Sequence, residues 1–448
     1  MGSDMTVGKP MRIILKFMLT MLAGNLFQQL YNMADTVIVG HFVGANALAA
    51  VGSTGTLMFL VLGVCQGMAT GFSVLTGQRF GAHDEDATRR SVANGILLSA
   101  IVIGIMTLLS LLSVKPLLKL MNTPAAIYDD AKSYITVIFI GIACSMLYNL
   151  LSSYLRAVGN SQAPVYFLLL SAVLNIFLDL LLIIVFRMGV TGAAVATVIS
   201  QGVSVVLCWI YMMKKIPVLA PRKEDWRLSR LTSAQQLKIG LPMALMFGIT
   251  ASGTTIMQAA INLFGEVAVS GVTAAGKIST LVCVGMYAIG QTMTAYSSQN
   301  FGVRNLDRLK EGIRCALIIM LVYSIAAGAV SMLLLPRLLP LFFSGSADIA
   351  SMMPYASKYT LMCAVTYFPL NMIFIFRNSM QGCGYAILPT CVGVVEFFAR
   401  LAVALLSMNL HSFTLAAGCD PFAWTAGGVF GCIAWLWVAK DIKKKLGL

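Results

Sequence analysis

Charged residues are scarce in this chain: they make up 11% of its 448 residues, whereas 58% are hydrophobic and the mean hydropathy is +0.85. Soluble globular domains carry about 25% charged residues, so the composition argues against an ordinary water-soluble domain. Apolar runs of roughly 20 residues, the length that crosses a bilayer as a helix, recur along the whole chain. The sequence therefore predicts a protein that spans a membrane many times.

The motifs of membrane enzymes and nucleotide-driven pumps are also missing. The ten cysteines lie singly and form no C-x-x-C pair, and the three histidines form no H-E-x-x-H. Residues 271–278 resemble a phosphate-binding Walker A loop, but Ile278 replaces the Ser or Thr that would hold magnesium, and the stretch lies in an apolar run. We therefore expect no enzyme and no cofactor, which leaves a proton or a sodium ion as the energy source for any transport.

The apolar runs predict an all-α polytopic membrane protein with twelve transmembrane helices. The expected helices lie at about 12–40, 46–75, 91–115, 126–152, 163–186, 190–213, 237–263, 267–297, 311–336, 350–376, 386–409 and 422–440. Basic residues crowd into alternate loops and the two ends of the chain. Because basic loops stay on the cytoplasmic side, both termini are predicted to be cytoplasmic. The net charge of +14 is then explained by the lipid bilayer as partner and not by nucleic acid.

The chain contains two copies of one unit. Gln78-Arg79-Phe80-Gly81 reappears as Gln299-Asn300-Phe301-Gly302 at an offset of 221, and Gly159 corresponds to Gly384 at an offset of 225. Since each copy contains six helices, the two copies enter the membrane in the same orientation, as parallel repeats around a central cavity. We expect an N-lobe at 1–213, a partly helical linker at 214–236 and a C-lobe at 237–448.

Charges inside the predicted spans are few, and each costs about 2.5–3.5 kcal/mol at a helix centre. They are Asp35, Asp179, Lys277, Glu396 and Arg400. Glu396 and Arg400 are spaced i, i+4 and are expected to pair within one helix. For Lys277 three partners stay open: Glu396, a helix C-terminus or an anionic ligand. Together these three residues predict a polar network in the C-lobe.

Asp35 and Asp179 have no basic residue near them in their own helices. Asn175 precedes Asp179 by one turn, and the polar residues Gln28, Tyr31 and Asn32 precede Asp35 within two turns. Oxygen ligands on facing helices suit a hard monovalent cation or a proton relay. The alternative is that these residues only make hydrogen bonds between helices.

Several stretches resemble the multidrug and toxic compound extrusion (MATE) transporters, nearest to their DinF-like and YoeA-like bacterial branch. These stretches are residues 24–40 (GNLFQQLYNMADTVIVG), 155–159 (LRAVG), 175–179 (NIFLD) and 192–197 (GAAVAT). The resemblance implies a monomeric antiporter of the bacterial cytoplasmic membrane that exports small organic, often cationic and amphipathic compounds by alternating access. It also implies a proton or sodium site at Asp35, Asn175, Asp179 and Thr197.

One position departs from the family pattern. Thr20 stands where the first helix usually has a proline, whereas the second half keeps Pro242. A weaker hinge at Gly24, or one made by the Thr20 hydroxyl bonding to the backbone, is expected instead. The alternative function is a flippase for lipid-linked precursors from the same superfamily, which would need a cationic cavity. A sensor or scaffold would need a soluble output domain.

Overall fold

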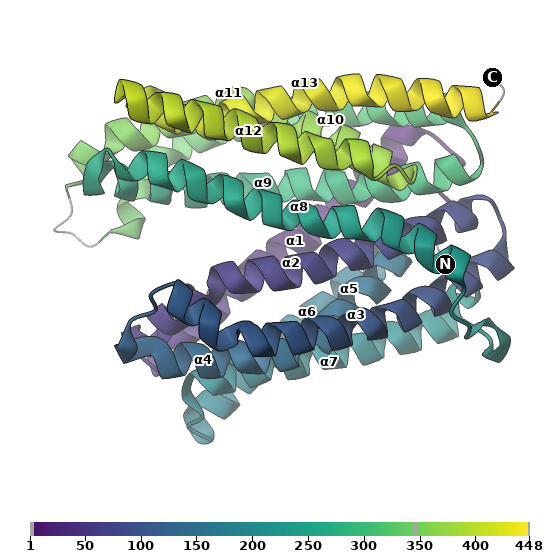
Figure 1. The fold of residues 1–448 in the computed structure, drawn as a ribbon, viewed down its shortest axis with the longest axis horizontal. Coiled ribbons are helices and arrows are strands. Elements are labelled where there is room, and N and C mark those ends of the chain that lie inside the picture. Colours follow the sequence, from purple (N-terminus) through teal and green to yellow (C-terminus); the bar gives the residue numbers. More distant parts are fainter. Residues whose placement is uncertain (1–3, 344–347, 447–448) are drawn as a thin grey trace. The chain divides into compact units, whose positions relative to one another are not determined.

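The chain folds almost entirely into long helices. The computed structural model describes residues 4–343 and 348–446, and every regular element within these ranges is helical (Figure 1). Eleven of these helices are long and apolar enough to cross a membrane, and one bent pair brings the total to twelve if it forms a single span. Large apolar side chains such as Leu112, Val365 and Trp437 are exposed, as expected for surfaces that face lipid. The predicted all-α polytopic fold is confirmed.

The helices of the first half run from α1 to α7. Their bounds are α1 (Pro10–Phe42), α2 (Ala45–Gly81), α3 (Glu85–Leu120), α4 (Ala125–Ile140), α5 (Ile142–Ala157), α6 (Gln162–Leu180) and α7 (Gly189–Lys215). A π-helical turn, Leu181–Val185, continues α6. The sequence predicts a single helix at 126–152, but the structure breaks it into α4 and α5, bent by 47°. The break falls at Gly141, where a Cβ would lie 2.2 Å from Val198 Cγ2 of α7, so glycine lets the bend approach that helix.

The helices of the second half run from α8 to α13. Their bounds are α8 (Arg230–Asn262), α9 (Gly265–Gly302), α10 (Leu306–Leu338), α11 (Ile349–Gly382), α12 (Ile387–Leu410) and α13 (Phe413–Leu446). Between α7 and α8 the chain forms two short 3-10 turns, Pro217–Leu219 and Lys223–Asp225. The linker is therefore partly helical, and α8 begins earlier than the apolar run because residues 230–236 are polar but still helical.

Equivalent turns in the two halves have the same backbone geometry. His83 and Arg304, 221 residues apart, both adopt φ 57° after the second long helix of their half. The next residues, Asp84 and Asn305, cap the following helices by accepting the N–H groups of Ala87 and Arg308, each at 2.9 Å. The internal repeat therefore extends to the turns, beyond the motifs that reveal it in the sequence.

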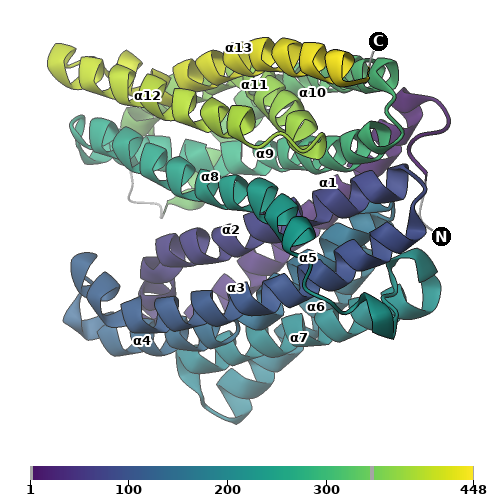
Figure 2. The same cartoon turned by 45° about the vertical axis from the view of Figure 1, so that its right-hand side comes forward.

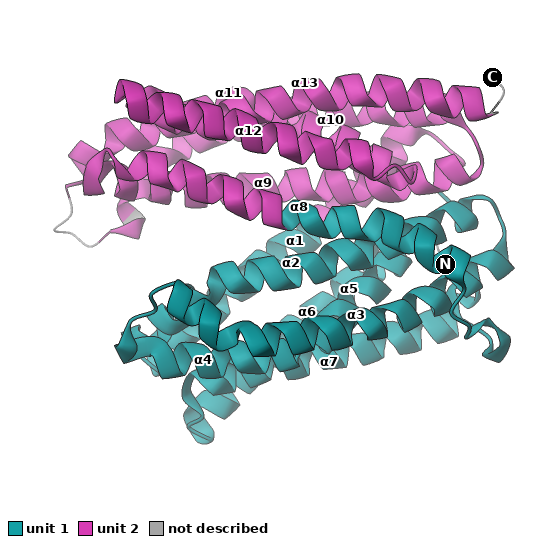
Figure 3. Ribbon diagram, in the orientation of Figure 1, with its two compact units in different colours: residues 1–4, 23–247 teal, residues 5–22, 248–448 magenta. Residues whose placement is uncertain are grey.

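Contacts divide the chain into two compact units (Figure 3). Unit 1 contains residues 1–4 and 23–247, and unit 2 contains residues 5–22 and 248–448. These bounds differ from the lobes expected from the repeat, because α1 and α8 each begin in one unit and continue into the other. The first half of α1 packs Ile14, Phe17 and Met18 into the core of unit 2. The first half of α8 packs on α2 in unit 1. Gly71 of α2 lies so close to Gly240 of α8 that a Cβ added at Gly71 would be 2.3 Å from the Gly240 Cα.

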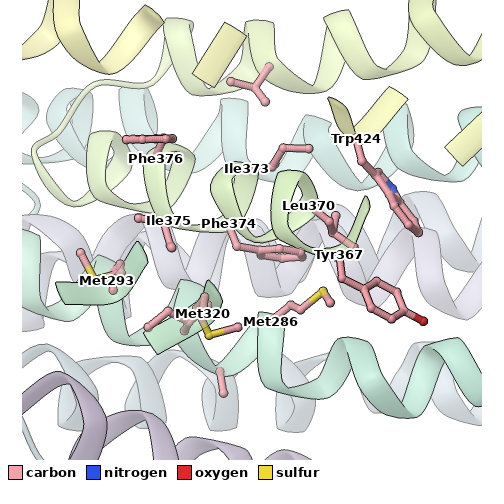
Figure 4. Close-up of a cluster of buried hydrophobic side chains, with 14 of the residues drawn as sticks. Met286, Met293, Met320, Tyr367, Leu370, Ile373, Phe374, Ile375, Phe376 and Trp424 are labelled. Carbon is pink, nitrogen blue, oxygen red and sulfur yellow. The ribbon is translucent and has the colours of Figure 1, made fainter. Parts of the chain in front are cut away.

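The core of unit 2 is rich in methionine and aromatic side chains. Met286 and Met293 of α9 and Met320 of α10 are fully buried, and Tyr367 of α11 and Trp424 of α13 join them (Figure 4). Within this unit α12 and α13 pack side by side along their length (Figures 1 and 2). Much of the methionine content therefore fills a packed core.

Candidate cation site in unit 1

Four residues that the sequence singles out come together inside unit 1. Asp35 lies in the second half of α1, Asn175 and Asp179 share one face of α6, and Thr197 lies on α7. Asn175 and Asp179 are one turn apart and both are fully buried, whereas Asp35 is partly buried. The π-helical turn of residues 181–185 begins two residues after Asp179, and such turns are frequent at functional sites.

The carboxyl groups of Asp35 and Asp179 face each other within hydrogen-bonding reach. Each keeps a buried Oδ1 atom that has no hydrogen-bond partner in the described residues, and neither carboxylate belongs to any ion pair found there. Two ionised carboxylates offer only acceptors to one another and repel. A proton shared between them, or a cation between them, would satisfy both groups.

Asn175 and Thr197 extend the oxygen-rich surface around this pair. In the amide orientation that satisfies both of its groups, Asn175 Nδ2 donates to Asp179 Oδ2 at 2.9 Å and its Oδ1 accepts the Thr197 N–H at 3.1 Å. The Thr197 hydroxyl donates to Ala193 O at 3.0 Å, which leaves its oxygen lone pairs available as acceptors. Carboxylate, amide and hydroxyl oxygens are the donor set that suits a hard cation such as sodium.

Two tyrosines border the carboxylates. The Tyr31 hydroxyl of α1 lies within hydrogen-bonding reach of Thr197, and Tyr31 interacts electrostatically with both aspartates. Tyr134 of α4 is buried and also interacts with Asp35 and Asp179. Nothing in the sequence marks Tyr134, because it lies 99 residues from Asp35 and tyrosine is common in membrane helices.

Gln28 and Asn32, the other two residues of α1 that the sequence singles out, are not linked to the carboxylates by hydrogen bonds in the described part of the chain. Gln28 and Asn32 are exposed, and Asn32 Nδ2 donates to Gln29 Oε1 at 3.5 Å. No hydrogen bond within residues 4–343 and 348–446 joins either of them to Asp35 or Asp179. Of the three supporting residues, the structure therefore brings Tyr31 alone to the pair.

The expected ion pair within one helix of the C-lobe is wrong. Arg400 Nε donates to Asp420 Oδ1 of α13 at 2.7 Å, and Glu396 lies 3.9 Å from Arg377 of α11. Both arginines find carboxylates on neighbouring helices because α11, α12 and α13 pack closely. The expected network also included Lys277, but this residue is exposed and takes part in no ion pair of the described chain. Asp420 does not stand out in the sequence because residues 418–421 (GCDP) resemble a loop, whereas α13 continues through them.

No group of three or more histidine, cysteine, aspartate or glutamate side chains converges in the described ranges, the surroundings of Asp35 and Asp179 included. Two carboxylates with neutral oxygen ligands suit a proton or a monovalent cation. The Asp35–Asp179 pair, with Asn175 and Thr197, is therefore the cation site that the geometry supports best.

Known proteins resemble this chain in sequence and in fold. Residues 21–181 and 242–406 match the MatE protein family. The "Probable multidrug resistance protein YpnP" of Bacillus subtilis is 30% identical over 309 residues, which cover 68% of this chain and 68% of that protein. The "Probable multidrug resistance protein NorM" of Thermotoga maritima is 25% identical over 412 residues, covering 90% of this chain and 86% of that protein.

A solved structure described as the outward-facing conformation of a multidrug resistance MATE family transporter has the same fold. It aligns with a TM-score of 0.89 at 23% identity, over 99% of this chain and 98% of that chain. At this identity the match concerns the fold alone.

Proposed function

This chain belongs to the MatE family, the multidrug and toxic compound extrusion transporters, and we propose that it is a secondary active antiporter. It exports small organic, cationic and amphipathic compounds in exchange for protons or sodium ions. We place it as a monomer in the bacterial cytoplasmic membrane, with both termini in the cytoplasm as the basic loops predict.

One observation supports this proposal above all: two carboxylates face each other inside unit 1 without a basic partner in the described residues. A cationic substrate is attracted to such a charge, and a proton or sodium ion neutralises the same charge. Ion entry therefore releases the substrate, and loss of the ion restores the site. A flippase for pyrophosphate-linked lipids would need cations where unit 1 carries these carboxylates.

Transport into vesicles tests the proposal directly. The purified protein is reconstituted in liposomes, a pH or sodium gradient is imposed, and movement of the cationic dye ethidium is followed by fluorescence. We expect gradient-driven transport in the wild type and a loss of about tenfold or more in Asp35→Asn and in Asp179→Asn, because the ion and the substrate no longer compete for one charge.

Asp307→Asn is the matched control, since it removes a carboxylate that is 97% exposed at the start of α10. This variant is expected to transport at the wild-type rate. Full dye transport in both Asp35→Asn and Asp179→Asn, or wild-type transport that ignores both gradients, would overturn the proposed function.

A further inference from the structure

A cavity lined by arginines lies in unit 1, away from the carboxylate pair. Its volume is about 550 Å³, within the usual range for small-molecule sites of roughly 300–1,000 Å³. The lining comes from the end of α2, the start of α3, the linker and the start of α8. Its residues are Arg79, Asp86, Ala87, Arg90, Arg222, Glu224, Asp225, Arg227, Ser229 and Thr232.

The acidic residues of this lining are already paired. Asp86 and Asp225 both lie against the buried Arg89, Asp225 at 3.8 Å, and Asp225 also accepts the Arg222 N–H at 2.8 Å. Glu224 lies 3.9 Å from Arg222 Nη1. Three arginines of the lining, Arg79, Arg90 and Arg227, form no ion pair in the part of the chain that the structure describes. With four arginines against three carboxylates, the lining carries a net positive charge.

Arg79 is held in place by its neighbours. Its Nη1 donates to Ala87 O of α3 at 3.0 Å and its Nη2 donates to Thr232 Oγ1 of α8 at 3.4 Å. Asp84 interacts with it electrostatically and also accepts the Ala87 N–H as the cap of α3. A guanidinium has five N–H donors, so Arg79 keeps donors for a further acceptor.

The second half of the chain shows how the equivalent position is satisfied there. Asn300 replaces Arg79 at the offset of 221, and its Nδ2 donates to Met5 O at 3.3 Å. Arg308, which corresponds to Ala87, donates to the same carbonyl at 3.0 Å. In unit 2 a backbone carbonyl of the same unit thus accepts from the residue at this position. In unit 1 the equivalent residue is a charged donor, Arg79, that faces the cavity.

We propose that this cavity binds a phosphate group, with Arg79, Arg90 and Arg227 as its ligands. Arginine matches phosphate oxygens with two parallel N–H donors, and every basic residue of the lining is an arginine. The nearby lysines, Lys214, Lys215 and Lys223, are not among the lining residues. The cavity also lies at the end of unit 1 that the basic loops predict to be cytoplasmic, where anionic headgroups gather. The phosphate belongs either to an anionic lipid or to a soluble phosphate compound.

Bound phosphate would join α2, α3 and the linker through these three arginines, so it should raise the melting temperature. One arm of the test adds inorganic pyrophosphate to the protein in neutral detergent. The other compares nanodiscs of pure phosphatidylcholine with nanodiscs containing phosphatidylglycerol. Stabilisation in the first arm indicates a soluble ligand, and stabilisation in the second arm alone indicates a lipid headgroup.

The variants Arg79→Asn and Arg227→Gln should each lower the affinity for the probe that stabilises the wild type by about tenfold. The reason is that each variant removes a charge-assisted hydrogen bond. Arg79→Asn introduces the residue that unit 2 carries at the equivalent position, and Arg227 is exposed, so both variants should fold. Lys215→Gln removes the same charge outside the lining and should leave binding unchanged. The proposal is overturned if neither probe stabilises the wild type, or if Lys215→Gln loses as much affinity as the arginine variants.

Discussion

At the scale of single residues, the candidate cation site contains charged carboxylate oxygens and neutral amide and hydroxyl oxygens. Asp35 and Asp179 carry the charge, whereas Asn175 and Thr197 contribute only neutral dipoles. The Asn175 amide donates to Asp179 and accepts the Thr197 N–H, so it links the two. A proton binds to one carboxylate oxygen, but a sodium ion needs several oxygen ligands at once. The neutral residues should therefore matter more for sodium than for protons.

We predict that Asn175→Ala and Thr197→Ala lower sodium-dependent stabilisation and sodium-driven transport more than they lower proton-driven transport. Melting temperature as a function of sodium concentration, and dye transport under each gradient, measure the two effects. Thr425→Ala is the control. Like Thr197, Thr425 donates its hydroxyl to the carbonyl four residues earlier, Pro421 O at 2.8 Å, but it belongs to unit 2, whereas the carboxylate pair belongs to unit 1. Equal losses under both gradients would assign the two residues a purely structural role.

The residues of this site differ in how visible they are in the sequence. Asp35, Asn175 and Asp179 stand out because polar groups are costly in an apolar run, and Thr197 is identified through the family resemblance. Tyr134 and Asp420 could not be found in this way. Tyrosine is unremarkable in a membrane helix, and the sequence does not tell which face of α4 turns toward α1. Asp420 sits beside Pro421, which is tolerated inside α13 although it reads as a helix breaker.

The buried ion pair of unit 2 gives the second prediction at this scale. The side chains of Arg400 and Asp420 are 6% and 10% exposed and meet at 2.7 Å. Removing one partner leaves an uncompensated buried charge, so Asp420→Asn or Arg400→Met should destabilise unit 2 by about 3–5 kcal/mol. The double variant that combines Arg400→Met with Asp420→Leu should recover much of this loss, because it removes both charges.

Thermal unfolding in detergent checks the ion-pair prediction, with Glu396→Gln as the comparison. Glu396 lies 3.9 Å from Arg377 and its buried Oε1 accepts no hydrogen bond in the described residues. Its substitution should therefore cost less than the loss of Asp420. A melting temperature that does not change in Asp420→Asn would contradict this account of the pair.

At the scale of whole elements, α1 and α8 are unlike the other long helices because each belongs to both units. α1 passes from unit 2 to unit 1 between residues 22 and 23, and α8 passes from unit 1 to unit 2 between residues 247 and 248. Just before this point α8 carries Pro242, and α1 carries Thr20, whose hydroxyl donates to Lys16 O at 3.1 Å. Both features weaken the regular backbone hydrogen bonding of a helix.

We predict that Thr20→Pro folds and costs less than the roughly 3 kcal/mol expected for proline inside a helix. The reason is that α8 already holds a proline near its own passage between units. Thr70→Pro is the matched control, since Thr70 bonds to Gln66 O at 2.9 Å in α2, which lies wholly within unit 1. Melting temperature and folded yield decide the matter: equal damage from the two substitutions would mean that α1 has no special tolerance at residue 20.

At the scale of the whole molecule, the membrane-spanning helices, eleven or twelve in the described residues, and the internal repeat could be predicted from hydropathy and self-comparison. The division of α1 and α8 between two units could not. Apolar runs show where a helix crosses the membrane, and repeated motifs show which helices are equivalent. Neither shows which neighbours a helix touches along its length. That information lies in close approaches such as Gly71 against Gly240, which depend on how two distant segments fit together.

The exchange of a coupling ion for a cationic substrate should be visible in their binding affinities, provided that the proposed function holds. If ion and cationic substrate compete for the Asp35–Asp179 pair, each must weaken the binding of the other by the same factor, because binding free energies are linked. Because the two compete for one charge, the apparent dissociation constant of ethidium should keep rising with ion concentration once the ion begins to occupy the pair. Ethidium affinity is measured by fluorescence anisotropy across sodium and proton concentrations, and ion affinity by melting with and without ethidium. Asp307→Asn should keep the full effect, whereas Asp35→Asn should reduce both factors together. Dye affinity that is independent of both sodium and proton concentration would show that substrate and ion do not share this pair.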